Sequence, residues 1–169
     1  MKIELSPQQK TVIDVLNKAR AMELYAIMQY MNQHYGLYDD DYVRLAREMK
    51  KVAIEEMKHA EMFAERIHDI CSAMEPTTEA DADRPTVRGQ EAEEIYGFDA
   101  EVESGTMAKY NEFMKLCREN NDSVSATLFE KIIDEEQRHF TYFSDVDTHI
   151  RKLGTCFLAE MAGKSEHVA

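Results

Sequence analysis

Two short stretches of the chain repeat one pattern of acids and a histidine, Glu-Glu-x-x-His. Its copies are Glu55, Glu56 and His59 in "AIEEMKHAE" (53–61), and Glu135, Glu136 and His139 in "IIDEEQRHF" (132–140). A carboxylate and an imidazole three residues apart share one face of a helix. In each copy the second glutamate and the histidine fall on the apolar spacing itself, where leucine or isoleucine is expected. We interpret Glu55 and Glu135, about 100° off that stripe, as surface or cavity-lining residues.

Two further glutamates, Glu23 and Glu103, interrupt the apolar stripes of two other predicted helices at mid-length. An offset of 33 positions separates two pairs: Glu23 and Glu56, and Glu103 and Glu136. An offset of 80 positions separates three pairs: Glu23 and Glu103, His59 and His139, and Tyr30 and Tyr110. One helical hairpin used twice would bring four glutamates and two histidines together at mid-height of a pseudo-twofold bundle.

Four carboxylates in an apolar bundle need neutralisation, because each buried charge costs several kcal/mol even after relaxation. Either the carboxylates hold protons, or cations balance them, and two divalent metals would balance four carboxylates. Imidazole and carboxylate ligands suit iron or manganese, with zinc as a competitor. One glutamate from each of two helices plus Glu-x-x-His from each of the others is the di-iron carboxylate pattern. A polar core network without metal is the alternative.

The elements that must position these residues are helices. The 169 residues, 44 % hydrophobic and 31 % charged, suit a single domain over 1–169. Ser6, Pro7 and Gln9 form a helix-start signature. The sequence predicts four long helices and a short fifth, at about 7–35, 39–72, 98–119, 121–151 and 153–162.

The links between these helices predict the fold class. The first two helices and the next two are joined by short links and should form antiparallel hairpins. The stretch of about 73–97 is long, acidic and contains Pro76 and Pro85. A long crossover between two hairpins predicts an all-α, ferritin-like four-helix bundle. A disordered linker between independent hairpins is the alternative, although a lone hairpin could not bury its apolar face.

Composition excludes several classes of function. A net charge of −13 argues against nucleic-acid binding, which depends on Lys and Arg. No apolar run approaches the ~20 residues of a membrane span, and the beginning "MKIELSPQQK" lacks the apolar stretch of a signal peptide. The three cysteines form no Cys-x-x-Cys pair, which argues against a disulfide framework and a rubredoxin-type site. We expect a cytoplasmic protein.

The sequence resembles the bacterioferritins over nearly its whole length, most closely those of anaerobic, sulfate-reducing bacteria. The resemblance is most specific in "VLNKARAMELYAIMQYMNQHY", "IEEMKHAEMFAERI" and "LFEKIIDEEQRHF". It implies a terminal ligand pair for one iron, Glu23 with His59, and for the other, Glu103 with His139. It also implies that Glu56 and Glu136 bridge the two ions. Tyr30 would lie beside the site as a hydrogen-bond donor or redox group, or equally as a packed core tyrosine.

Met57 lies one position after Glu56, so its side chain points about 100° away from the di-metal stripe. A mild apolar strip surrounds it: Ala53, Ala60 and Ala64. Physical reasoning alone favours a subunit interface at this strip. The resemblance implies a haem held between two subunits by Met57 from each chain, flanked by Leu24, Met28 and Met31.

The resemblance implies a ferroxidase and iron-storage protein. Fe(II) would be oxidised by O2 or peroxide and stored as ferric mineral inside a hollow homo-oligomeric shell of 24 subunits. Two rivals remain open. One is another di-metal enzyme on this bundle, such as a peroxidase, a manganese catalase or an oxygenase. The other is a miniature ferritin, which binds iron between subunits and lacks the internal Glu-x-x-His pairs. Size separates the large shell from the rivals, since 24 chains of 19.6 kDa amount to about 470 kDa.

Overall fold

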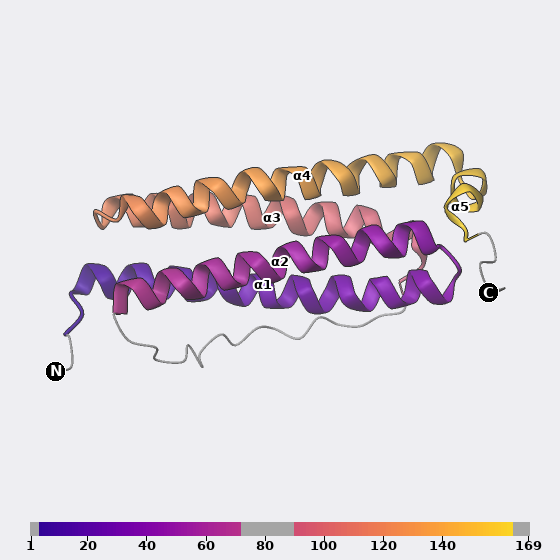
Figure 1. Ribbon diagram of the computed structural model, residues 1–169. Helices are drawn as coiled ribbons and strands as arrows, with labels where there is room; N and C mark the ends of the chain where they lie inside the picture. The colour runs from indigo at the N-terminus through magenta and orange to yellow at the C-terminus, as the bar shows by residue number, and fades with distance from the viewer. Residues whose placement is uncertain (1–3, 72–89, 164–169) are drawn as a thin grey trace.

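The computed structural model describes residues 4–71 and 90–163, and within them it contains five α-helices and no strand. The helices are α1 (Pro7–Asp39), α2 (Val43–Cys71), α3 (Ala92–Glu119), α4 (Ser123–Leu153) and α5 (Thr155–Met161). The hairpin of α1 and α2 lies beside the hairpin of α3 and α4, and α5 lies at one end of the bundle (Figure 1). The prediction of an all-α, ferritin-like bundle is confirmed.

The connection between the hairpins falls mostly outside the described residues. The helix α2 ends at one end of the bundle and α3 begins near the other (Figure 1), as expected for a single crossover. Only residues 90–97 of the predicted crossover are described, and most of them belong to α3. Within the described ranges, none of the helices combines the length and apolar character that a bilayer span requires.

The predicted beginning of α1 is confirmed, but its predicted end at about residue 35 is wrong. Gln9 N donates to Ser6 Oγ (3.2 Å) and Ser6 N donates to Gln9 Oε1 (2.9 Å), which completes a capping box. The helix continues past Gly36 because Leu37 is buried in the core. The turn lies instead at Asp41, whose φ of 65° is left-handed, so α2 begins at Val43 rather than at 39.

Helix α3 begins six residues before its predicted start at 98, because its first turns bury apolar side chains. Ile95 and Tyr96 lie in the core, and the acidic Glu93 and Glu94 suit the positive end of the helix dipole. Gly97 lies inside the helix, where a Cβ would approach Asp147 Oδ1 on α4 to 3.1 Å. The glycine thus marks close packing rather than a helix boundary. The predicted starts of α4 and α5, at 121 and 153, lie two residues early.

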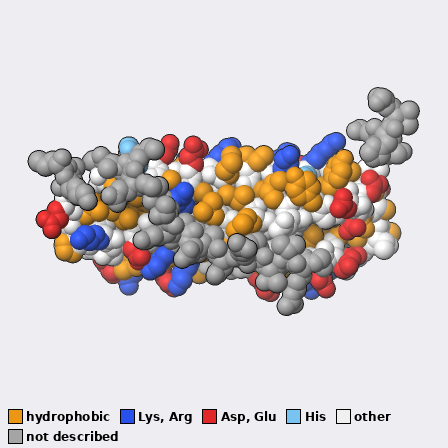
Figure 2. Space-filling view, turned by 90° about the horizontal axis from the view of Figure 1, so that it is seen from below, with side chains coloured by type: hydrophobic (Ala, Val, Ile, Leu, Met, Phe, Trp, Pro, Cys, Tyr) orange, Lys and Arg blue, Asp and Glu red, His pale blue; other side chains and the backbone are white. Residues whose placement is uncertain are grey.

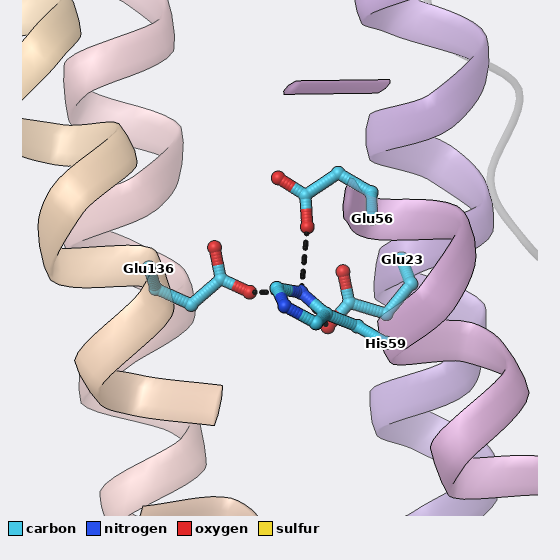
Figure 3. A group of neighbouring side chains, drawn as sticks. All are labelled: Glu23, Glu56, His59 and Glu136. Atoms are coloured by element: carbon cyan, nitrogen blue, oxygen red, sulfur yellow. Dashed lines mark hydrogen bonds and ion pairs between the residues drawn. The ribbon is translucent and has the colours of Figure 1, made fainter. Parts of the chain in front are cut away.

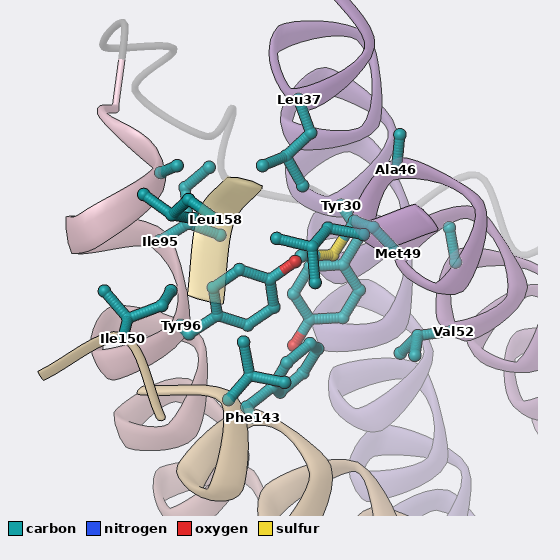
Figure 4. Close-up of a cluster of buried hydrophobic side chains, with 14 of the residues drawn as sticks. Tyr30, Leu37, Ala46, Met49, Val52, Ile95, Tyr96, Phe143, Ile150 and Leu158 are labelled. Atoms are coloured by element: carbon teal, nitrogen blue, oxygen red, sulfur yellow. The ribbon is translucent and has the colours of Figure 1, made fainter. Parts of the chain in front are cut away.

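The apolar core is divided into two clusters, one on each side of a polar layer at mid-height. One cluster surrounds Phe143 and Tyr96 near α5 (Figure 4), and the other surrounds Phe63 and Phe129 near the opposite end. On α2 the residues between these clusters are Glu56 and His59. Burial of the two apolar clusters stabilises the bundle, so its centre can hold ionisable groups.

A polar contact joins the two hairpins at the end farther from α5. Arg66 Nη2 on α2 donates to both carboxylate oxygens of Asp122 (3.0 Å each), and its Nε donates to Ser125 Oγ (2.9 Å). Asp122 is the N-cap of α4 and accepts from Ser125 N (2.9 Å). Burial alone would raise the pKa of Asp122, but bonds from Ser125 and Arg66 lower it. Arg66 therefore fixes both the hairpin pairing and the beginning of α4.

We predict that Arg66→Gln lowers the free energy of unfolding by about 1–3 kcal/mol, because it leaves a half-buried capping carboxylate without its cation. Chemical denaturation followed by circular dichroism measures the change. The matched control is Arg118→Gln, which removes an exposed arginine 3.6 Å from Glu130. The control should change stability by no more than about 0.5 kcal/mol. Equal effects of the two substitutions would contradict the assigned role of Arg66.

Candidate metal centre

The structure brings all six predicted ligand residues together at the centre of the bundle. Each of the four long helices contributes: Glu23 from α1, Glu56 and His59 from α2, Glu103 from α3, and Glu136 and His139 from α4. All six side chains are buried. Figure 3 shows four of them converging from the two hairpins.

The six residues form two overlapping groups of possible metal ligands. One group consists of Glu23, Glu56, His59 and Glu136, and the other of Glu56, Glu103, Glu136 and His139. Within each group, one ligand atom per residue lies within 4.8 Å of the others. Glu56 and Glu136 belong to both groups, which is the arrangement that two bridging carboxylates require.

The histidine rings are held in one orientation. His59 Nδ1 points inward, 2.9 Å from Glu56 Oε2 and 3.0 Å from Glu136 Oε1. On the outer edge of the ring, His59 Nε2 lies 3.0 Å from Glu135 Oε2. The second histidine repeats this, with His139 Nδ1 facing inward and His139 Nε2 2.7 Å from Glu55 Oε2. A carboxylate behind the ring favours the proton on Nε2 and leaves the Nδ1 lone pair for a metal.

Glu55 and Glu135 therefore do more than line a surface. Each binds the histidine of the other hairpin, although half of the Glu55 side chain remains exposed. The interpretation of these residues as plain surface or cavity-lining groups missed this contact. The repeated Glu-Glu pair in both motifs is the signal that could have revealed it.

Two tyrosines hold the remaining glutamates in the same crosswise manner. Tyr30 OH on α1 donates to Glu103 Oε1 on α3, and Tyr110 OH on α3 donates to Glu23 Oε1 on α1. Both tyrosines are fully buried. Sequence reasoning placed Tyr30 beside the site but did not include Tyr110, although the offset of 80 residues pairs the two.

The metal-free centre balances its charge with protons. Burial alone would lower the pKa of His59, but hydrogen bonds with Glu136 and Glu56 raise it to about 11, and those contacts raise that of His139 to about 12. Burial would raise the pKa of Glu136, but His139 and His59 lower it to about 2. Glu136 therefore departs from our expectation that the carboxylates of the site have raised pKa values.

Glu23 and Glu103 agree with that expectation. Burial raises the pKa of both carboxyl groups well above the ordinary value, and the charges of Glu136 and Glu56 add to the effect. Two imidazolium–carboxylate pairs and two carboxylic acids thus make a buried cluster without excess charge. Divalent cations can take the place of these protons, and six nitrogen and oxygen ligands suit iron, manganese or zinc.

Met57 lies on the outside of the bundle, away from the six-residue centre. Its side chain is 54 % exposed, and other apolar side chains are exposed nearby in sequence or on α1, namely Ile54 and Met28. Figure 2 shows hydrophobic side chains along the middle of the face over α1 and α2. The predicted alanine strip is wrong in part, because Ala53 and Ala60 are buried inside the bundle.

Comparison with known proteins gives a family match over most of the chain. The model of the ferritin-like domain matches residues 13–153. The bacterioferritin of Desulfovibrio desulfuricans is 53% identical over 90% of this chain and 83% of its own length. The bacterioferritin of Brucella melitensis is 32% identical over 85% of this chain and 86% of its own length.

Two solved structures share the fold. The X-ray structure of Desulfovibrio desulfuricans bacterioferritin, which describes a diiron site in different catalytic states, superposes with a TM-score of 0.86 at 52% identity. The match covers 93% of this chain and 90% of that one. Bacterioferritin from Rhodobacter capsulatus, with a metal-free dinuclear site and haem iron, gives a TM-score of 0.85 at 27% identity over 98% of this chain and 99% of that one.

The protonation of the centre predicts how pH changes its stability. A pKa that is raised by folding stabilises the fold below the unfolded pKa, and this contribution is lost as pH rises toward the folded pKa. The raised pKa values of His59, His139, Glu23 and Glu103 therefore make the metal-free fold less stable as pH rises above about 6.5. Glu136 acts in the opposite direction, but only between about pH 2 and 4.5.

We predict that chelation of bound metal lowers the melting temperature more at about pH 8 than at about pH 5, because metal replaces the protons of the folded site. Differential scanning calorimetry with and without chelator measures both shifts. Equal shifts at the two pH values would contradict the assigned protonation states.

Proposed function

Because the chain belongs to the bacterioferritin family, we propose that it is a di-iron ferroxidase that oxidises Fe(II) with O2 or peroxide and stores the ferric product. The observation that carries this proposal is the pair of overlapping ligand groups at the bundle centre. A polar network without metal would not need two carboxylates shared between two complete groups. Iron is both the occupant of the centre and the substrate.

The geometry suggests one role for each ligand. Glu23 and His59 are terminal ligands on one side, and Glu103 and His139 are terminal ligands on the other. Glu56 and Glu136 bridge, since each lies within 3.2 Å of both inward imidazole nitrogens. Glu135 and Glu55 lie behind the histidines and keep each Nδ1 directed at the metals.

The chain supplies positions and protons for the reaction. When bound, the iron pair supplies the redox chemistry, and the carboxylates favour the higher charge of Fe(III). Tyr30 and Tyr110 donate to the two terminal glutamates and so orient them. Burial and the neighbouring carboxylates raise the pKa of both phenols, so both stay neutral donors. The surrounding aromatic side chains keep bulk water from the centre.

Storage requires an assembly, and we propose the 24-subunit shell of the family. An acidic chain with a net charge of −13 suits a wall that attracts Fe(II) and nucleates ferric oxide. We also propose a cytoplasmic location, which agrees with three free cysteines.

We further propose that Met57 from two chains ligates one haem per dimer. An exposed thioether with exposed Met28 and Ile54 is costly on a surface that remains in water, and it suits the edge of a flat apolar group. Leu24 and Met31 are half-buried on α1 and would flank the ring. Two neutral sulfur ligands favour the low-spin ferrous state.

The first test of the function removes a ligand. We predict that Glu136→Ala or His139→Ala slows rapid Fe(II) oxidation at two Fe(II) per chain by at least about 100-fold, since even outer-shell partners cost 10–100-fold. Stopped-flow absorbance measures the rate.

Assembly serves as the control for this test, because apolar contacts stabilise the fold. Both variants should elute with the wild type, near the mass of 24 chains. The matched substitution Glu130→Ala, at an exposed acid of α4, should leave the rate unchanged. Fast oxidation in both ligand variants would refute the assignment of the centre.

The second test concerns haem. We predict that Met57→Leu gives haem-free protein that still oxidises Fe(II), because the axial ligand is lost while the di-metal centre is intact. The Soret band per chain, after expression with ample haem, measures occupancy. Met62→Leu, a methionine on α2 that packs beside Lys131, should retain the band. A wild type without a Soret band, or a Met57→Leu variant that keeps it, would refute haem ligation.

A further inference from the structure

Apart from the four glutamates of the metal centre, the described residues contain one other fully buried carboxyl group. Asp99 on α3 has 0 % exposed surface. Its Oδ1 accepts a hydrogen bond from Gln33 Nε2 on α1 (2.8 Å), whereas its Oδ2 has no hydrogen-bond partner. An uncompensated buried carboxylate costs several kcal/mol. An asparagine would join α1 to α3 equally well, so a structural link does not explain an acid here.

Asp99 lies next to the metal centre along the bundle. It precedes Glu103 by one helical turn, and Gln33 follows Tyr30 by one turn. The Gln33–Asp99 bond is therefore the neighbour of the Tyr30–Glu103 bond, about 5–6 Å away. The pKa of Tyr30 is raised by burial, then by Glu103 and by Asp99, so the charge of Asp99 reaches Tyr30.

One proton on Asp99 would satisfy two orphan oxygen atoms. Gln33 Oε1 is also buried without a hydrogen-bond partner, while Gln33 Nε2 donates to Asp99 and to Gln90 Oε1 (2.8 Å). An ionised carboxylate and an amide oxygen can only accept. A proton on Asp99 Oδ2 supplies the missing donor, and acid and amide can then pair through two hydrogen bonds. Burial raises the pKa of Asp99 well above its usual value, against the bond from Gln33.

The neighbours of Asp99 offer no positive charge in place of that proton. Its charge acts on three phenols, Tyr30 on α1, Tyr96 on α3 and Tyr142 on α4. Glu48 on α2 acts on the last two. Figure 4 shows Tyr30 and Tyr96 beside Phe143, whose ring centroid lies 5.3 Å and 6.2 Å from theirs. This wall is apolar and phenolic, and it favours a neutral acid.

We propose that Asp99, paired with Gln33, holds a proton that it delivers to the metal centre through Tyr30 and Glu103 during iron oxidation. The proposal rests on the ferroxidase function proposed above. With peroxide as oxidant, two Fe(II) give one electron each, the O–O bond breaks, and two protons are taken up as two waters form. Tyr30 passes one of these protons to Glu103, and Asp99 restores it. Asp99 touches no metal and is a positioning residue.

The first experiment is independent of iron and activity. In metal-free protein, infrared spectroscopy should show the carbonyl band of a buried carboxylic acid that shifts in deuterated water and is absent in Asp99→Asn. Gln33→Leu should keep this band but move it to higher frequency, because the acid loses its amide partner. Identical spectra of the wild type and Asp99→Asn would overturn the proposal.

The second experiment tests the proton delivery. Asp99→Asn should bind two Zn²⁺ per chain as the wild type does, yet oxidise Fe(II) with peroxide about tenfold or more slowly. The wild-type rate should fall as alkaline pH ionises Asp99, and the variant should lack this step. Asp147→Asn, at a half-buried acid that pairs with Arg151 (2.7 Å), is the matched control and should behave as the wild type.

The outcomes separate this inference from the function on which it rests. A fast wild type with an equally fast Asp99→Asn, or one with the same pH profile, overturns the proton delivery alone. Weakened Zn²⁺ binding in Asp99→Asn also overturns it, because Asp99 would then orient the ligands. A wild type that oxidises no Fe(II) overturns both.

Discussion

The burial of six ionisable side chains at the centre of an apolar bundle is the constraint on which the rest of this structure depends. Four carboxylates and two imidazoles have almost no contact with solvent, and each charge left alone would cost several kcal/mol. Two imidazolium–carboxylate pairs and two carboxylic acids meet this cost without metal. Two divalent ions meet it with metal. The same arrangement therefore permits folding of the free chain and creates the preference for cations.

The surrounding layer exists to keep these groups in place. Each hairpin orients ligands that belong to the other, since Tyr30 binds Glu103 and Tyr110 binds Glu23. The histidines are held in the same crosswise way by Glu135 and Glu55. No hairpin can complete the site alone. Assembly of the two hairpins and formation of the centre are consequently one event, which fits a site built from a duplicated unit.

The division of the core follows from the same constraint. Apolar clusters around Phe143 and Phe63 lie on opposite sides of the polar layer, so that the bundle is stabilised at both ends and functional at its middle. The polar contacts outside the centre are few and specific. Arg66 fixes the distal end, and the Gln33–Asp99 pair extends the polar layer by one turn toward α5. An acid at that position fits a proton store beside the metals.

The sequence by itself determined the helices, the hairpin pairing and the identity of the six central residues, because helical periodicity and the 33- and 80-residue offsets are local or repetitive signals. Helix ends were less certain: Leu37 and Ile95 extend their helices through burial that depends on the other hairpin. Only the tertiary structure decided which side chains meet across the bundle. The contacts of Glu135 with His59 and of Asp99 with Gln33 join residues more than 60 positions apart, and no periodicity encodes a pairing that packing alone brings into contact.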